Sequence, residues 1–157
     1  MLRFRLAELN DADLYYRWSN EKQTRQNSYN QDVIPYESHI KWFEERIRSD
    51  DAYMYLFLNE QDIAIGQVRI ERSKGPDAGM AVIGLSVDSE QRGKAYSAEM
   101  LQIATADFLS KNAGYSIHAY VFVSNEASYK SFLRAGYKLI EKKLEKGILS
   151  YILEKKS

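Results

Sequence analysis

The sequence contains no cysteine, and only two of its 157 residues are histidine. The absence of cysteine excludes disulfides, thiolate metal ligands and cysteine nucleophiles together. With two histidines in the whole chain, a zinc site is not expected, and we predict a protein without a bound metal. Any chemistry must therefore come from other side chains or from the backbone.

The chain also lacks net charge and long apolar runs. Lys and Arg together number 22, as do Asp and Glu. The chain has no block of like charge of the kind that binds nucleic acid, so we expect no nucleic-acid partner. No apolar run approaches the ~20 residues that cross a bilayer, and residues 1–6 alternate apolar with charged residues as a strand does. We expect a soluble, cytoplasmic protein with no membrane partner, and the hydrophobic content of 45% suits one domain spanning residues 1–157.

Hydrophobic periodicity predicts strands and helices along the whole chain. Helices are expected from Asn10 or Asp11 to about Trp18, at 36–48, from Gly93 to about Lys111, and from Asn125 to Gly136. Strands are expected at 2–6, 53–58, 63–70, 78–87, 117–123, 137–144 and 148–154. Residues 21–32 are polar and are expected to form turns. The order predicts an α/β fold, a mixed sheet with helices on both faces and a strand-helix-strand crossover at its middle.

The clearest local signal is the segment LSVDSEQRGKAYS at residues 85–97, where a strand leads through a Gly-containing turn into a helix. Unpaired N–H groups at the start of a helix lie at the positive end of its dipole, so they can bind a pyrophosphate. Gly93 and Ala95 leave room for a ligand, while Arg92 and Lys94 add positive charge. Taken alone, Arg-Gly-Lys is also common in surface turns.

A second segment, NEASYKSFLRAGY at residues 125–137, lies downstream of the first. Together the two segments resemble motifs of the GCN5-related N-acetyltransferase family. In that family Gln/Arg-x-x-Gly-x-Gly/Ala cradles the CoA pyrophosphate, and Asn-x-x-Ala/Ser ending in Gly-Phe flanks the pantetheine. These motifs correspond here to residues 90–95 and 125–137, and the strand order matches the family along nearly the whole chain.

The resemblance implies acetyl-CoA as co-substrate and a mostly antiparallel, twisted sheet of about seven strands. It also implies a small-molecule amine as the acetyl acceptor. The residues that it assigns to CoA are Leu85, Ser86, Val87, Arg92, Gly93, Lys94, Ala95, Tyr96, Ser97, Asn125 and Ser128.

Two positions depart from the family pattern. Glu90 stands where Gln or Arg is usual, which removes a side-chain contact but leaves the backbone cradle. Phe132 stands where many relatives have the Tyr that protonates the departing CoA thiolate. Tyr129 lies one helical turn earlier, so its hydroxyl is a candidate for this role. The alternative is that Tyr129 packs in the core.

The family's mechanism is direct attack of a neutral amine on the thioester. By this resemblance the N–H of Val87 steadies the acetyl oxygen, a contact commonly worth ~3 kcal/mol. An alkyl ammonium of pKa ~10 must lose a proton, and His39 on the second predicted helix is a candidate base. Beside Trp42 and Phe43, His39 can equally be a packing residue.

The N-terminal third is similar to bacterial acetyltransferases that modify nucleotide-linked amino sugars. The likeness is carried by RWSN at residues 17–20, Arg25, Ser28 and HIKW at residues 39–42. The proposed acceptor contacts are Arg17, Trp18, Arg25, Tyr36 and Trp42. Aromatic rings can stack on a sugar or base, and an arginine can bind a phosphate. Alternatively, these aromatic residues form the core beneath the first two helices.

Other functions are compatible with the same motifs. A polyamine acceptor calls for an acidic cleft, for which Glu44, Glu45, Asp50 and Asp51 are candidates. A protein N-terminal acceptor calls for an open, acidic groove, whereas an amino-sugar nucleotide calls for an enclosed and partly basic one. A CoA-binding module without catalysis is a further alternative, because of Phe132. The closing hairpin and the sheet edges offer surfaces for a homodimer, which we keep as an expectation.

Overall fold

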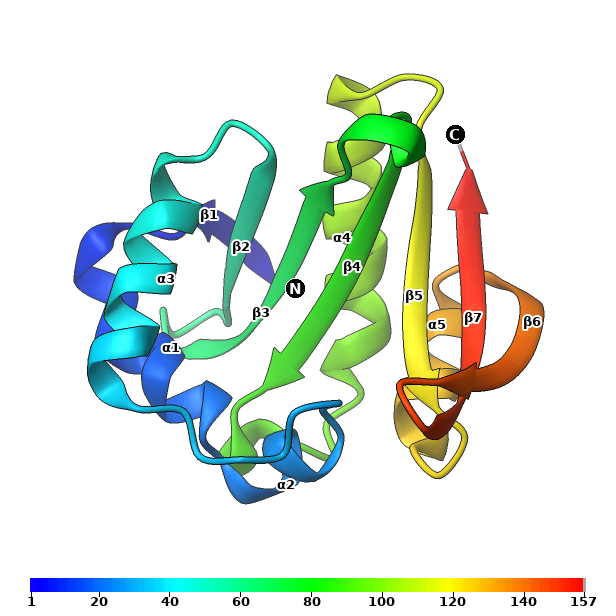
Figure 1. Cartoon of the computed structure of the whole chain (residues 1–157). Coiled ribbons are helices and arrows are strands. Elements are labelled where there is room, and N and C mark those ends of the chain that lie inside the picture. The colour runs from blue at the N-terminus through cyan, green and yellow to red at the C-terminus, as the bar shows by residue number, and fades with distance from the viewer. Residues whose placement is uncertain (157) are drawn as a thin grey trace.

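The computed structural model describes residues 1–156 and shows a seven-stranded sheet in the order β1-β2-β3-β4-β5-β7-β6 (Figure 1). All neighbouring strands pair antiparallel except β4 and β5, which pair in parallel. The strands are β1 (Arg3–Leu6), β2 (Ala52–Leu58), β3 (Ala64–Arg72), β4 (Met80–Val87), β5 (Ser116–Phe122), β6 (Lys138–Glu145) and β7 (Ile148–Lys156). The predicted α/β class and its mostly antiparallel seven-stranded sheet are confirmed.

Helices cover both faces of this sheet, as predicted. On one face α4 (Tyr96–Lys111) and α5 (Glu126–Arg134) lie behind the strands in Figure 1, and on the other α1 (Ala12–Ser19) and α3 (Tyr36–Arg48) lie in front of β1 to β3. Apolar side chains fill both interfaces because each element presents one apolar face to the sheet. Met100 and Phe108 of α4 are fully buried on one side, and Phe43 of α3 on the other.

One short helix was not predicted from the sequence. Residues 21–32 were expected to form turns, but α2 (Lys22–Gln26) lies within them. The Glu21 side chain caps this helix by accepting a hydrogen bond from the Thr24 N–H at 3.1 Å. A five-residue helix without apolar spacing has no periodic signal, so its residues can be recognised only from their tertiary contacts.

The described part of the chain contains neither a membrane-spanning helix nor a metal-binding cluster. None of the helices within residues 1–156 is both long and apolar enough to cross a bilayer. In the same residues, no three His, Asp or Glu side chains gather as metal ligands.

Candidate active site

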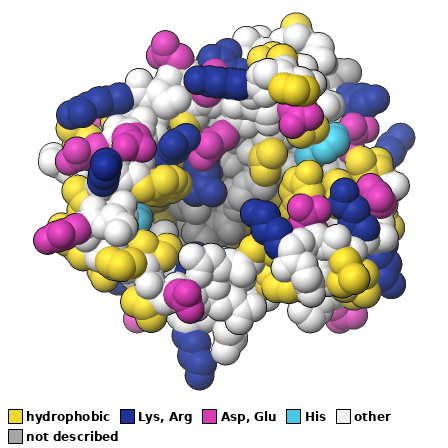
Figure 2. Space-filling view, in the orientation of Figure 1, with side chains coloured by type: hydrophobic (Ala, Val, Ile, Leu, Met, Phe, Trp, Pro, Cys, Tyr) yellow, Lys and Arg dark blue, Asp and Glu magenta, His cyan; other side chains and the backbone are white. Residues whose placement is uncertain are grey.

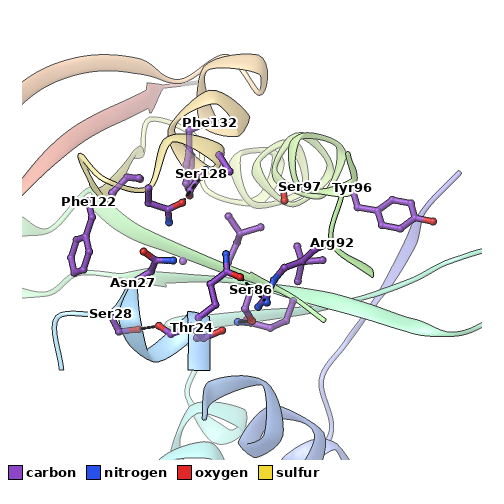
Figure 3. A pocket seen from close by; sticks show the side chains of 18 of the residues that line it. Thr24, Asn27, Ser28, Ser86, Arg92, Tyr96, Ser97, Phe122, Ser128 and Phe132 are labelled. Carbon is purple, nitrogen blue, oxygen red and sulfur yellow. Dashed lines mark hydrogen bonds between the residues drawn. The ribbon is translucent and has the colours of Figure 1, made fainter. Parts of the chain in front are cut away.

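A cleft of about 480 Å³ opens where β4 and β5 separate. Figure 2 shows it as a hollow in the middle of the face that carries α1 to α3. In Figure 3 Thr24, Asn27 and Ser28 form one wall, while Ser97, Ser128 and Phe132 of α4 and α5 form the opposite one. The cleft is thus assembled from segments that lie far apart in the sequence.

The strand separation leaves main-chain donors of β4 without a partner strand. Parallel pairing of β4 with β5 ends at Ile83 and Ala119. The Asp88 N–H donates to the Ile65 carbonyl at 2.8 Å, and bonding residues alternate along an antiparallel pair. Leu85 and Val87 therefore direct their N–H groups away from β3, towards the gap beside β5.

The turn before α4 presents a second set of free donors. Gly93 has a φ of 78° and Ala95, the N-cap residue, a φ of 60°. No side chain caps α4, and within residues 1–156 no acceptor is found for the N–H groups of residues 93–96. In contrast, α2 and α5 are capped by Glu21 and Asn125. A helix start with several open N–H groups can bind an anion.

The side chains of Arg92 and Lys94, expected to contact the phosphates, make contacts with other side chains. The Arg92 guanidinium donates to both carboxylate oxygens of Glu21, at 2.9 Å each, and this lowers the pKa of Glu21 to about 2. Arg92 therefore braces α2 against the turn, in addition to any contact with a ligand. Lys94 bonds Gln91 at 3.1 Å and does not line the cleft.

The other predicted CoA residues surround the cleft. Leu85, Ser86, Val87, Gly93, Ala95, Tyr96, Ser97, Asn125 and Ser128 all line it. Asn125 caps α5 by accepting from the Ser128 N–H at 3.3 Å, so both are held by local structure. The ring of Tyr96 points away from the opposite wall in Figure 3, so Tyr96 lines the cleft with its backbone at the start of α4.

Phe132 and Tyr129 of α5 have different surroundings. Phe132 is buried and lines the cleft, whereas Tyr129 does not line it. The Tyr129 ring instead stacks on Tyr151 with the ring centroids 4.2 Å apart. The packing alternative thus describes the position of Tyr129, and its hydroxyl is not placed to donate a proton into the cleft.

We therefore expect Tyr129→Phe to leave acetyl transfer within about twofold of wild type, because only a hydroxyl outside the cleft is lost. Steady-state kcat and KM for acetyl-CoA check this. Phe132→Ala is the contrasting variant, since it removes a ring that lines the cleft. A tenfold or larger fall in kcat for Tyr129→Phe would show that the hydroxyl reaches the reaction by another conformation.

His39 lies outside the cleft, which corrects its candidacy as the base. It is only 2% exposed, its Nε2 lies 3.1 Å from the Ala12 carbonyl oxygen, and its ring packs against Tyr16, Trp42 and Phe43. Burial lowers the pKa of His39. These contacts make it a packing residue between α1 and α3.

Only one of the five predicted acceptor residues lines the cleft. Arg25 does, with its guanidinium bonded to the carbonyls of Ser19 and Asn30 at 2.7 Å each, which orders the segment after α2. Arg17 and Trp18 lie outside the cleft and bind Asp88 at 3.0 and 2.8 Å.

The two remaining aromatic candidates also lie elsewhere. The Tyr36 hydroxyl donates to Asp13 at 2.7 Å on an exposed surface. Trp42 is partly buried beneath the Arg69 guanidinium, whose Cζ lies 5.0 Å from the ring centroid. Helical spacing does not show which face of α1 or α3 meets a cleft, and here Tyr36 lies on the exposed surface while Trp42 packs beneath Arg69.

Several residues that line the cleft were missed by the sequence argument. They are Gln67 and Arg69 of β3, Tyr120 and Phe122 of β5, and Thr24 and Asn27 around α2. For Gln67 and Arg69 a signal existed, because they alternate with buried Val68 and Ile70 in a central strand. A polar face in the middle of a sheet marks a position that a cleft exposes.

Arginine supplies all the charged side chains that line the cleft within the described residues. They are Arg25, Arg69 and Arg92, and neither a carboxylate nor an imidazole joins them. The acidic candidates Glu44, Glu45, Asp50 and Asp51 lie on α3 or just after it, away from the cleft. Asp51 is engaged instead with Arg72 and Lys74, at 3.1 Å each.

Comparison with known proteins gives a family and a fold. The family model described as "Acetyltransferase (GNAT) domain" matches residues 1–138. A search of curated proteins finds no match.

Similar solved structures share the whole architecture at low identity. The spermidine N-acetyltransferase from Vibrio cholerae in complex with CoA and spermine is 13% identical, with a TM-score of 0.87 over 98% of this chain and 94% of that one. The aminoglycoside acetyltransferase AAC(6')-Ib in complex with coenzyme A and kanamycin is also 13% identical, with a TM-score of 0.80 over 99% and 95%. A domain from Methanocaldococcus jannaschii is 19% identical, with a TM-score of 0.80 over 98% and 97%.

Proposed function

The chain belongs to the acetyltransferase (GNAT) family, and we propose that this acetyl-CoA-dependent N-acetyltransferase acts on the primary amine of a small polar molecule. The observation that carries the proposal is one cleft with two sets of open main-chain donors. One set belongs to residues 93–96, and the other to Leu85 and Val87 on the separated strand. The first suits a diphosphate and the second an acetyl oxygen that gains charge.

The residues fit the co-substrate in order along the cleft. The N–H groups of residues 93–96 receive the pyrophosphate, and the gap between β4 and β5 receives the pantetheine beside Ser128 and Phe132. The N–H of Val87 then donates to the thioester oxygen as charge develops on it during attack. The strand gap thus orients the acetyl group and stabilises the transition state.

Deprotonation of the amine does not require a side-chain base in this cleft. Three arginines and no carboxylate line it. Arg92 is paired with Glu21, but Arg25 and the partly balanced Arg69 leave an excess positive charge that lowers the pKa of a bound ammonium. The amine therefore loses its proton to solvent more readily than it does in water.

Protonation of the leaving group is a separate step. A thiol of pKa ~8.5 needs little help to regain a proton, so Phe132 at the usual Tyr position is compatible with turnover.

A nucleotide-linked amino sugar is the acceptor that we propose. The uncharged polar and arginine-rich lining supports it, because a polyamine would find no carboxylate to bind. With Trp18, Tyr36 and Trp42 outside the cleft, the ring that can stack on a sugar or base is the partly exposed Tyr120, since Phe122 is buried against Tyr29.

The proposal predicts acetyl-CoA-dependent transfer to one class in a panel of amino-sugar nucleotides, aminoglycosides, polyamines and short peptides. Release of CoA can be followed with a thiol reagent without background from the protein, because the chain contains no cysteine. Mass spectrometry of the acceptor confirms the N-acetyl product. We expect the highest kcat/KM with an amino-sugar nucleotide.

Binding of acetyl-CoA, measured by calorimetry on the same samples, separates the alternatives. Binding without transfer to any amine would support the CoA-binding module without catalysis. Preference for spermidine or a peptide would overturn the acceptor but keep the activity.

The homodimer stays a prediction. The edge strand β6 exposes Leu139, Ile140 and Leu144, which a second copy could cover. Lys143, which lies between Glu141 and Glu145 on the same strand, acts against edge pairing.

A further inference from the structure

Arg69 stands out among the cleft residues because its charge is only partly balanced. Its Nε lies 2.9 Å from Oε1 of Glu71, but Oε2 of the same carboxylate accepts from Arg46 Nη1 at 3.2 Å. One carboxylate thus serves two guanidinium groups, and the cluster keeps an excess positive charge. A partly buried cluster with an excess charge favours the binding of a counter-ion.

The free end of the guanidinium faces the cleft. The side chain is 36% exposed although it belongs to a central strand, and it lines the cleft. Within residues 1–156, no hydrogen bond is found for Nη1 or Nη2, the two nitrogens that form a bidentate pair with an anion.

The neighbouring residues hold the guanidinium in this position. The Trp42 ring lies beneath it, with 5.0 Å between Cζ and the ring centroid. Gly84 pairs with Arg69 across the strands. Because Gly84 has no side chain, the guanidinium can lie over its backbone, where an added Cβ would be 3.9 Å from Nη2. A guanidinium fixed in this way loses little entropy when it binds a ligand.

Gln67 supplies the second half of the arrangement. It lies two residues before Arg69 on the same face of β3, about 7 Å away along the strand. Its Nε2 donates to the Ser86 hydroxyl at 2.9 Å, while its Oε1 has no partner in the described chain. A compact ligand can therefore place an N–H or O–H near Gln67 and an anion at Arg69.

We propose that Arg69 determines acceptor specificity by binding an anionic group, a carboxylate or phosphate, that the amine substrate carries in addition to its amine. The inference rests on the proposed acetyl transfer. It narrows the acceptor class to amines with a negative charge near the reacting nitrogen, and it excludes polycations.

The test uses acceptor pairs that differ only in the anion. Glucosamine 6-phosphate is compared with glucosamine, and 4-aminobutyrate with its amide, so that the two pairs distinguish phosphate from carboxylate. In wild type we expect kcat/KM to be at least tenfold higher for the anionic member of one pair. Arg69→Gln should reduce that preference to about twofold or less, and Arg69→Lys should retain part of it.

The matched control is Arg48→Gln, which removes the same charge from the exposed end of α3, outside the cleft. It should leave the preference unchanged. Equal rates for both members of each pair, or an unchanged preference in Arg69→Gln, would overturn the inference.

A binding measurement keeps the inference testable if none of these amines is acetylated. In CoA-saturated protein the fluorescence of Trp42, adjacent to Arg69, should change on titration with glucosamine 6-phosphate. This change should be absent in Arg69→Gln and present in Arg48→Gln. Loss of CoA binding itself would instead count against the proposed function, which separates the two failures.

Discussion

Replacing Gly93 by Asp is expected to weaken acetyl-CoA binding about 100-fold. The new carboxylate would lie among the N–H groups of residues 93–96, where it would accept their hydrogen bonds and repel a diphosphate. Two unit charges about 6 Å apart at an effective dielectric constant of ~20 repel by about 3 kcal/mol, which corresponds to roughly a 100-fold change. Calorimetric titration with CoA measures the affinity directly, without any need for a known acceptor.

Gly93→Asn is the matched control, because it has the same shape and the same backbone requirement. Gly93 has a φ of 78°, a conformation that Asn and Asp tolerate better than most residues, and no heavy atom lies within 4 Å of an added Cβ. Both variants should therefore fold and lose similar stability, while only the Asp variant loses CoA. Equal affinity in the Asp variant and wild type would mean that the diphosphate binds elsewhere.

The turn before α4 could be predicted from sequence because its chemistry is local. A strand, a glycine at positive φ and the first turn of a helix occupy consecutive residues, so the donors at 93–96 follow from the order of residues alone. The strands were predicted for a related reason. Alternation such as that of Ile117, Ala119 and Val121 reflects burial on one face, and all three are buried.

The acceptor half of the cleft could not be predicted, because it depends on contacts between distant segments. Trp18 was predicted to stack on the acceptor and His39 to act as a base, but both side chains are buried at the interface of α1 and α3. The segment around α2 is positioned by the Glu21 contact with Arg92, 71 residues away in sequence, and by Tyr29, whose hydroxyl bonds the Ser150 hydroxyl at 2.6 Å. No local pattern encodes either contact.

Replacing Gly66 by Ala is expected to lower the free energy of unfolding by about 3 kcal/mol and kcat by about 100-fold. An added Cβ would lie 2.5 Å from the Ser86 carbonyl oxygen, 2.9 Å from Met100 Cε and 3.1 Å from Val87 Cα. Since the nearest atom belongs to the backbone, β3 and β4 must move apart. Gly66 pairs directly with Val87, so this movement displaces the proposed oxyanion donor. Chemical denaturation and steady-state kinetics measure the two effects.

Gly84→Ala is the control for Gly66→Ala. It also replaces a glycine within a strand, but at a position where the neighbouring strand does not approach closely. Its added Cβ meets nothing closer than Arg69 Nη2 at 3.9 Å, so stability and kcat should stay near wild type and any change should fall on KM for the acceptor. The two measurements on Gly66→Ala separate the effect on strand packing from the effect on the Val87 N–H. If Gly66→Ala loses stability but keeps kcat, the strands approach closely there but the acetyl oxygen is stabilised by a donor other than Val87. The Leu85 N–H, which faces the same gap, would then be the donor to consider.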